Sequence, residues 1–155
     1  MAARVPEGPR VRVAALILLD GKVVLVRHRA LNSSYHLLPG GGVDYRETLE
    51  SALVREVAEE TGLQVEVGRP LLINDTIDPA GCRHVVNITF FATVIGGEIT
   101  ESPQDRRVEA ADLCDVGALA GLDLRPPLAE AIAVILDGTD TTTRYLGPLF
   151  KEVDA

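Results

Sequence analysis

The chain has 155 residues, of which 46% are hydrophobic, and it carries a formal net charge of −8 with a pI near 4.8. This length fits one domain over residues 1–155 with a substantial core, and the acidic balance argues against binding a nucleic acid polymer, because phosphate contacts need a clustered basic face. No apolar run approaches the roughly 20 residues of a membrane span, and the N-terminus lacks the apolar stretch of a signal peptide, so we expect a cytoplasmic protein.

The start of the chain predicts strands. Residues 10–19 run from alternating into continuous apolar sequence, which is typical of a central strand, and Asp20-Gly21 predicts a hairpin turn into a second strand at 22–29. Residues 35–42 then combine a short strand with a proline and three glycines. Such a segment can bend sharply and bring its backbone close to a ligand.

The middle of the chain predicts one helix followed by strands. From 48 to 61 the apolar residues recur at helical spacing, and Gly62 is a typical stop signal. Residues 64–77 and 83–97 are strand-like, and 78–81 has the composition of a turn. Strands therefore lie on both sides of the helix in the sequence.

The C-terminal part is less regular. Residues 98–112 are polar and predict a loop, 124–138 predict a second amphipathic helix, and 139–155 give no clear pattern. Cys82 and Cys114 lie far apart without a metal-ligand pattern, so we interpret both as ordinary thiols. Strands before and after one helix, with a second helix later, predict an α/β fold in which a mixed sheet is covered on both faces.

Three glutamates share one face of the predicted helix. At about 100° per residue, Glu59 and Glu60 lie about 60° and about 40° to either side of Glu56. Two carboxylates about 5 Å apart repel by about 3 kcal/mol at an effective dielectric of about 20, so a cation among them would stabilise this face. Mg²⁺ or Mn²⁺ is suitable, because hard cations take carboxylate and phosphate oxygens. The alternative is a solvated acidic surface.

The spacing of these residues carries a family resemblance. Gly41, five residues, Glu47, seven residues and then the run REVAEETGL at 55–63 resembles the Nudix box of the Nudix hydrolases at every position. The resemblance implies a Nudix-type α/β/α sandwich with a mixed β-sheet. It also implies hydrolysis of a nucleoside diphosphate linked to another group X, with a divalent metal, Mg²⁺ or Mn²⁺, as the cofactor.

The resemblance also implies roles for single residues. Glu47 and Arg55 would form an orienting pair, since a guanidinium can hold a carboxylate by two parallel bonds; the alternative is a plain surface ion pair. A water would attack one phosphorus while a carboxylate takes its proton. The implied metal ligands are Glu56, Glu59, Glu60 and the backbone carbonyl of Gly40.

The general base stays open between two positions. In similar enzymes it is a glutamate of the box, here Glu56 or Glu59, or a glutamate in a loop after the sheet. The predicted loop at 98–112 offers four carboxylates, each of which has a solvated surface charge as its alternative. They are Glu98, Glu101, Asp105 and Glu109, with Glu109 our first choice.

Residues outside the box bear on the substrate. Some ADP-ribose hydrolases of this family carry a proline at a set distance after the box, and Pro79, 16 residues beyond Leu63, looks like that pattern. The alternative is a type I turn at 78–81. Tyr35 has two interpretations, stacking on a base or packing beneath the glycines. The arginines predicted to flank the cleft, where a guanidinium can clamp a phosphate, are Arg27, Arg29 and Arg83.

Three functions are carried as hypotheses. We expect a hydrolase of ADP-ribose or a nucleotide sugar, and the first alternative is a MutT-like nucleoside triphosphate pyrophosphohydrolase. The GGGVD start departs from the PGGK-like start of many oxidised-nucleotide cleaners, which argues against that role. The second alternative is a non-catalytic Nudix-like sensor, which the complete ligand set argues against. The resemblance further implies a homodimer and a small-molecule substrate, and the lack of a long apolar run predicts no membrane partner.

Overall fold

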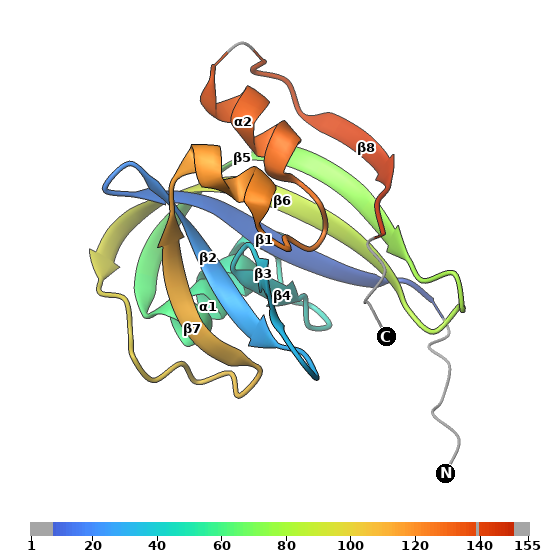
Figure 1. Cartoon of the computed structure of the whole chain (residues 1–155), viewed down its shortest axis with the longest axis horizontal. Coiled ribbons are helices and arrows are strands. Elements are labelled where there is room, and N and C mark those ends of the chain that lie inside the picture. Colours follow the sequence, from blue (N-terminus) through green and yellow to red (C-terminus); the bar gives the residue numbers. More distant parts are fainter. Residues whose placement is uncertain (1–7, 139, 151–155) are drawn as a thin grey trace.

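A mixed β-sheet forms the centre of the molecule. The computed structural model describes residues 8–138 and 140–150. Its elements are β1 Arg10–Leu19, β2 Lys22–Arg29, β3 Ser34–Leu37, β4 Gly40–Gly42, α1 Leu49–Thr61, β5 Leu63–Ile77, β6 His84–Gly97, β7 Val108–Cys114, the short 3₁₀ helix η1 Val116–Gly121, α2 Ala129–Leu136 and β8 Arg144–Pro148. The strands follow the order β3-β2-β1-β6-β5-β8, with β4 paired to β1 and β7 paired to β2 (Figure 1).

β1 is the strand that joins the parts of the sheet. It pairs with β6 in parallel over residues 10–17, with β4 antiparallel at 12–14, and with β2 antiparallel at 18–19. The long β5–β6 hairpin lies on one side of β1, and β2 with β3 and β7 lies on the other. The glycines of β4 are therefore held directly against the central strand.

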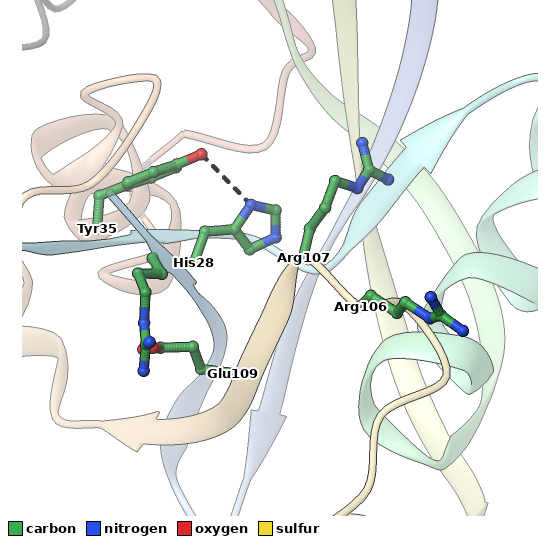
Figure 2. Close-up of a pocket in the computed structure, with 6 residues that line it drawn as sticks. His28, Tyr35, Arg106, Arg107 and Glu109 are labelled. Carbon is green, nitrogen blue, oxygen red and sulfur yellow. Dashed lines mark hydrogen bonds and ion pairs between the residues drawn. The ribbon is translucent and has the colours of Figure 1, made fainter. Parts of the chain in front are cut away.

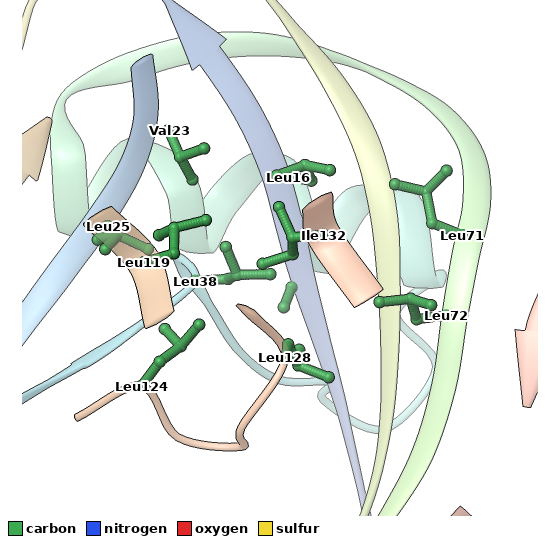
Figure 3. Close-up of a cluster of buried hydrophobic side chains, with 11 residues drawn as sticks. Leu16, Val23, Leu25, Leu38, Leu71, Leu72, Leu119, Leu124, Leu128 and Ile132 are labelled. Atoms are coloured by element: carbon green, nitrogen blue, oxygen red, sulfur yellow. The ribbon is translucent and has the colours of Figure 1, made fainter. Parts of the chain in front are cut away.

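Two hydrophobic cores lie on opposite faces of the sheet. Because side chains alternate along a strand, β1 contributes Val13, Ala15 and Ile17 to one core and Ala14 and Leu16 to the other. Figure 1 shows α1 on one face of the sheet and α2 with η1 on the other, which confirms the predicted α/β/α sandwich. Figure 3 shows the core under α2, whose buried side chains include Leu16, Val23, Leu25, Leu71, Leu72, Leu119 and Ile132.

α1 has strong signals at both ends. The side chain of Thr48 caps its start by accepting the N–H of Ser51 at 3.1 Å. Gly62 ends it in the left-handed conformation, with φ of 81°, and donates its own N–H to the carbonyl four residues back at 2.9 Å. Leu53 and Val57 are fully buried. This buried stripe fixes the direction in which the neighbouring glutamates of the helix point.

Two predictions for the C-terminal part are wrong in their bounds. The polar segment 98–112 is not a loop throughout, because β7 begins at Val108 and pairs with β2. Only the first residue of β7 is buried, so this strand is held by backbone pairing and carries no apolar pattern. The helix predicted at 124–138 is confined to the bounds of α2, since Pro126 and Pro127 disfavour helical geometry for the residue before each.

The segment 139–155, which carried no clear pattern, contains an edge strand. β8 runs parallel to β5, and the hydroxyl of Tyr145 donates to the carboxylate of Asp75 on that neighbour. Residues 139 and 151–155 lie outside the described residues. Within the described ranges, none of the helices has the length and hydropathy needed to span a bilayer.

Candidate active site

α1 presents three glutamates, Glu56, Glu59 and Glu60, which we call the acidic face. The side chains of Glu60 and Glu56 are 3% and 11% exposed, whereas that of Glu59 is 37% exposed. Burial raises the pKa of the Glu56 carboxyl above its ordinary value. A buried carboxylate is costly unless hydrogen bonds or positive charge compensate it, so the contacts of this face decide what it can do.

The glycine strand β4 fits between β1 and the acidic face because it has no side chains. The N–H of Gly40 donates to Oε1 of Glu60 at 2.7 Å. A Cβ atom on Gly40 would overlap the carbonyl oxygen of Val13, and one on Gly41 would overlap the carboxylate of Glu56. Close approach of backbone to carboxylate is therefore what the glycines supply here.

Arg55 links the acidic face to the segment that precedes the helix. Its Nε and Nη2 donate to the two carboxylate oxygens of Glu47 at 2.9 and 2.8 Å, and these parallel bonds lower the pKa of Glu47 to about 2. Nη1 donates to Oε1 of Glu56 at 2.8 Å, and Nη2 reaches the carbonyl of Gly42 at 3.3 Å. One guanidinium thus ties two carboxylates and the glycine strand together.

The side chains of the acidic face point to different partners. Glu56 and Glu59 turn toward Nη1 of Arg55, at 2.8 and 3.6 Å, while Glu60 turns toward the backbone of Gly40. Within the described part of the chain, no three Asp, Glu, His or Cys side chains are grouped as a metal ion needs. The donor set still fits a divalent cation, because carboxylates are hard ligands and a cation would offset the burial that raises the pKa of Glu56.

A pocket of about 510 Å³ opens beside the acidic face (Figure 2). Ligand pockets of about 300–1,000 Å³ are typical for small molecules. Nε2 of His28 lies 4.0 Å from Oε2 of Glu60, so the pocket and the acidic face are neighbours. The lining residues are His28, Arg29, Tyr35, Arg106, Arg107 and Glu109.

Tyr35 forms one wall of this pocket. The guanidinium carbon of Arg125 lies 4.2 Å from the centroid of its ring, and the ring of His28 meets it edge-on at 5.5 Å. The hydroxyl of Tyr35 is 3.4 Å from Nδ1 of His28, as the dashed line in Figure 2 marks. The contacts of Tyr35 are therefore with His28 and Arg125, and they hold the ring on two sides.

Glu109, the first choice among the loop carboxylates, lies on β7 and lines the pocket. Nε of Arg29 donates to its Oε1 at 2.6 Å, and Nε of Arg27 lies 3.5 Å from its Oε2. Arg27 also lies 3.7 Å from Asp112, and it is not a lining residue. Of the predicted flanking arginines, the structure therefore brings only Arg29 to the pocket.

The other candidates lie outside the pocket. Glu98 and Glu101 are exposed, and the carboxylate of Asp105 is bound to an arginine of its own loop. Pro79 is exposed in the turn between β5 and β6, and Arg83 ends that turn by accepting the N–H of residue 78 at 2.9 Å. Neither Pro79 nor Arg83 lines the pocket.

Sequence reasoning missed several residues of this site. His28, Arg106 and Arg107 line the pocket, and Arg12, half-buried on β1, donates to the carbonyl of Leu38 at 2.9 Å. Burial lowers the pKa of Arg12. Arg106 and Arg107 are adjacent in the polar segment 98–112, and this adjacency is the sequence signal that could have indicated them. Nothing in the sequence distinguishes Arg12 from other strand arginines.

Comparisons with known proteins extend these observations. The family model described as the NUDIX domain matches residues 8–137. Over 115 residues the chain is 36% identical to the ADP-ribose pyrophosphatase of Methanocaldococcus jannaschii. This match covers 72% of this chain and 67% of that protein. Over 127 residues it is 29% identical to the NAD-capped RNA hydrolase NudC of Edwardsiella ictaluri, covering 82% of this chain but only 46% of that relative's length.

The fold also matches solved structures. The MutT NUDIX hydrolase of Burkholderia pseudomallei has a TM-score of 0.64 and 34% sequence identity, and the match covers 86% of this chain and 100% of that one. The similarity extends well beyond the helix that carries the acidic face. The family model's match over residues 8–137 includes the strands that line the pocket.

Proposed function

The chain belongs to the NUDIX domain family, and from this premise we propose that it hydrolyses the pyrophosphate bond of a nucleoside diphosphate linked to another group. The chain is a pyrophosphohydrolase of this family, and Nudix hydrolases generally use divalent metals. ADP-ribose or a nucleotide sugar is the substrate that we place first. Mg²⁺ or Mn²⁺ is the cofactor that we propose.

One observation carries this proposal, the contact between the acidic face and the cationic pocket. Glu60 is buried 4.0 Å from His28, a residue of the pocket wall. An anionic substrate in the pocket would meet Arg29, Arg106 and Arg107 on its way to the acidic face. A site that combines carboxylates for a cation with arginines for phosphate oxygens is suited to a metal-bound pyrophosphate.

The proposed roles follow from these positions. Bound here, a divalent cation would withdraw charge from the phosphorus and acidify a water. Arg55 would hold Glu56 in place, and its two bonds to Glu47 would fix the segment before the helix. Gly41 would keep the backbone close to the carboxylates. The residues proposed to hold the cation are Glu56, Glu59, Glu60 and the backbone carbonyl of Gly40.

Two positions compete for the general base. Glu56 or Glu59 would take the proton of the attacking water from the side of the acidic face. Glu109 would take it from the pocket wall, where Arg29 holds its carboxylate at 2.6 Å. Its place among the lining residues supports Glu109 over Glu98 and the other exposed loop carboxylates.

The substrate proposal draws on the relatives as well. The position of Pro79 and the relative named ADP-ribose pyrophosphatase both support ADP-ribose. The structural neighbour named MutT supports nucleoside triphosphates as the second candidate. The relative named NAD-capped RNA hydrolase adds a capped RNA to the substrates worth testing, although the net charge of −8 opposes binding of the polymer.

A substrate screen tests the proposal. The purified chain is incubated with ADP-ribose, nucleotide sugars, dinucleoside polyphosphates, nucleoside triphosphates and an NAD-capped RNA, with and without Mg²⁺ or Mn²⁺, and the products are separated by chromatography. We expect metal-dependent release of AMP from ADP-ribose. Monophosphate and pyrophosphate from triphosphates would favour the second candidate. Tight binding of one compound without turnover of any would point to a sensor.

A further inference from the structure

The loop between β6 and β7, residues 98–107, is anchored to the end of α1; we call it the arginine loop. The N–H of Thr100 donates to the carbonyl of Thr61, and the N–H of Gln104 donates to the carbonyl of Glu59, both at 2.9 Å. These bonds satisfy carbonyl groups that a helix end leaves free. They also place the loop beside the acidic face.

Arg107 of this loop is held by Asp105. Its Nε and Nη2 donate to Oδ1 and Oδ2 of Asp105 at 3.1 and 2.8 Å, and its backbone N–H donates to Oδ1 at 2.9 Å. The hydrogen bonds raise the pKa of Arg107 and lower that of Asp105. The pair of Arg107 and Asp105 is therefore electrically neutral. The Arg107 side chain is 73% exposed, and its guanidinium has further N–H donors that Asp105 does not use.

Arg106 differs from the other arginines of the pocket. Arg29 is paired with Glu109, and Arg107 with Asp105. Among the described residues, none forms a hydrogen bond or ion pair with the side chain of Arg106, which is exposed and lines the pocket. Figure 2 shows Arg106 and Arg107 on the far side of His28 from Tyr35.

We propose that Arg106 binds an ionised oxygen of the substrate's pyrophosphate, and that the pairings of Arg107 with Asp105 and of Arg29 with Glu109 leave Arg106 as the one unpaired arginine among the described residues that line the pocket. The inference rests on the proposed function and deepens it. A diphosphate diester carries one negative charge on each phosphate, whereas a triphosphate adds a terminal phosphate with a charge of about −1.5 to −2. A pocket lining with a single unpaired arginine therefore favours diphosphate diesters over triphosphates, and Arg106 and Asp105 determine this specificity.

Steady-state kinetics of Arg106→Gln with ADP-ribose and Mg²⁺ form the first test. Loss of one charge-assisted hydrogen bond should raise KM by about tenfold or more and change kcat by less than about threefold. Arg106→Lys, which keeps the charge, should recover part of the loss. Arg69→Gln is the matched control, because Arg69 is an exposed arginine of β5 whose charge acts on Asp140, away from the pocket.

Asp105→Asn provides a test in the opposite direction. Asparagine keeps an oxygen that can accept the N–H of Arg107, but it removes the charge that neutralises the Arg107 guanidinium. The ratio of kcat/KM for ATP to kcat/KM for ADP-ribose should rise by about fivefold or more, since the triphosphate gains more from an added positive charge. An unchanged or lower ratio overturns the charge-limit part of the inference.

Direct binding separates failure of this inference from failure of the proposed function. If the wild-type chain hydrolyses ADP-ribose but Arg106→Gln leaves KM unchanged, the inference is overturned and the function stands. If no substrate is hydrolysed, dissociation constants of ADP-ribose and ATP are measured by calorimetry with Mg²⁺, for the wild-type chain and for Arg106→Gln. Weaker binding after Arg106→Gln supports the inference. Equal affinity, or no binding of either nucleotide, overturns it.

Discussion

Glu59 is the most accessible carboxylate of the acidic face, with a side chain 37% exposed. Glu59→Gln removes the charge and keeps the shape, so turnover should fall by at least about tenfold while the melting temperature stays within about 2 °C of the wild type. The measurements are kcat with ADP-ribose and Mg²⁺ and a thermal melt. Glu66→Gln, at an exposed glutamate of β5, is the control. Unchanged turnover would remove Glu59 from the proposed metal ligands.

Arg55 contacts more of the site than any glutamate does. Arg55→Ala removes the hydrogen bonds to Glu47, Glu56 and the Gly42 carbonyl together. It leaves the largely buried Glu56 carboxylate without the positive charge of the guanidinium. We expect lower turnover and a loss of about 1–3 kcal/mol in the free energy of unfolding. Urea denaturation and steady-state kinetics check both. An effect on neither would make the pairing with Glu47 incidental.

The pairing of Glu47 with Arg55 also has a pH signature. The pKa of Glu47 is lowered to about 2 in the folded chain, against about 4.3 in an unfolded chain. Its contribution to stability is therefore complete above about pH 4.3 and is lost as the pH falls toward 2. The stability difference between wild type and Arg55→Ala should narrow over that interval, and a difference that is constant with pH would show that Glu47 contributes little.

At the scale of the element, the C-terminus of α1 combines a left-handed helix end at Gly62 with a close contact to the arginine loop. Gly62 has φ of 81°, and a Cβ atom there would lie 2.5 Å from the carbonyl oxygen of Glu98. Gly62→Ala should cost about 1–2 kcal/mol for the left-handed backbone and more for displacing the arginine loop. Gly81→Ala is the matched control, with φ of 75° and no atom within 4 Å of the added Cβ. Equal losses in urea denaturation would show that the contact with Glu98 costs nothing.

How well each element could be predicted depends on where its stabilisation comes from. β1, β2 and α1 carry apolar patterns and turn or cap residues of their own, so their predicted bounds agree with the structure to within one residue. The side chains of β7 and β8 are little buried, and these strands are held by backbone pairing with their neighbours. Backbone pairing does not require an apolar side-chain pattern, so the sequence does not indicate these strands. Pro126 and Pro127 explain why α2 begins later than its apolar pattern predicts, because each disfavours helical geometry in the residue before it.

The same reasoning explains what could be predicted of the site. The acidic face belongs to one helix, so spacing alone places its carboxylates together. The pocket is built from β2, β3, β7 and the arginine loop, and it depends on strand register: the pairing of His28 with Val108 and with Tyr35 brings the three segments together. Register between segments 80 residues apart is set by packing of the whole sheet, which no local pattern encodes.

At the scale of the molecule, the two cores share one sheet, and β1 supplies both. We therefore predict that the chain unfolds as one cooperative domain. Ile17→Ala in the core under α1 and Leu16→Ala in the core under α2 should each cost about 2–5 kcal/mol and lower the same transition. Calorimetry with both variants checks this. Two separable transitions, each sensitive to only one variant, would contradict it.

The assembly of the molecule stays a prediction. We expect a homodimer in the cytoplasm, and sedimentation or gel filtration at working concentration measures the first of these. A dimer should elute at about twice the chain mass of 16.6 kDa and dissociate on dilution. A single species at the chain mass over the whole concentration range would remove the dimer from the description of this enzyme.

The anchoring of the arginine loop uses only main-chain groups. Thr100 and Gln104 contribute their N–H groups, which every residue except proline has. Side chains at 101–107 can therefore be randomised in a combinatorial library without cutting the two tethers, provided that proline is kept out of position 104. Substitutions in this loop can therefore change its proposed contacts with the substrate while α1, to which the loop is hydrogen-bonded, keeps its sequence.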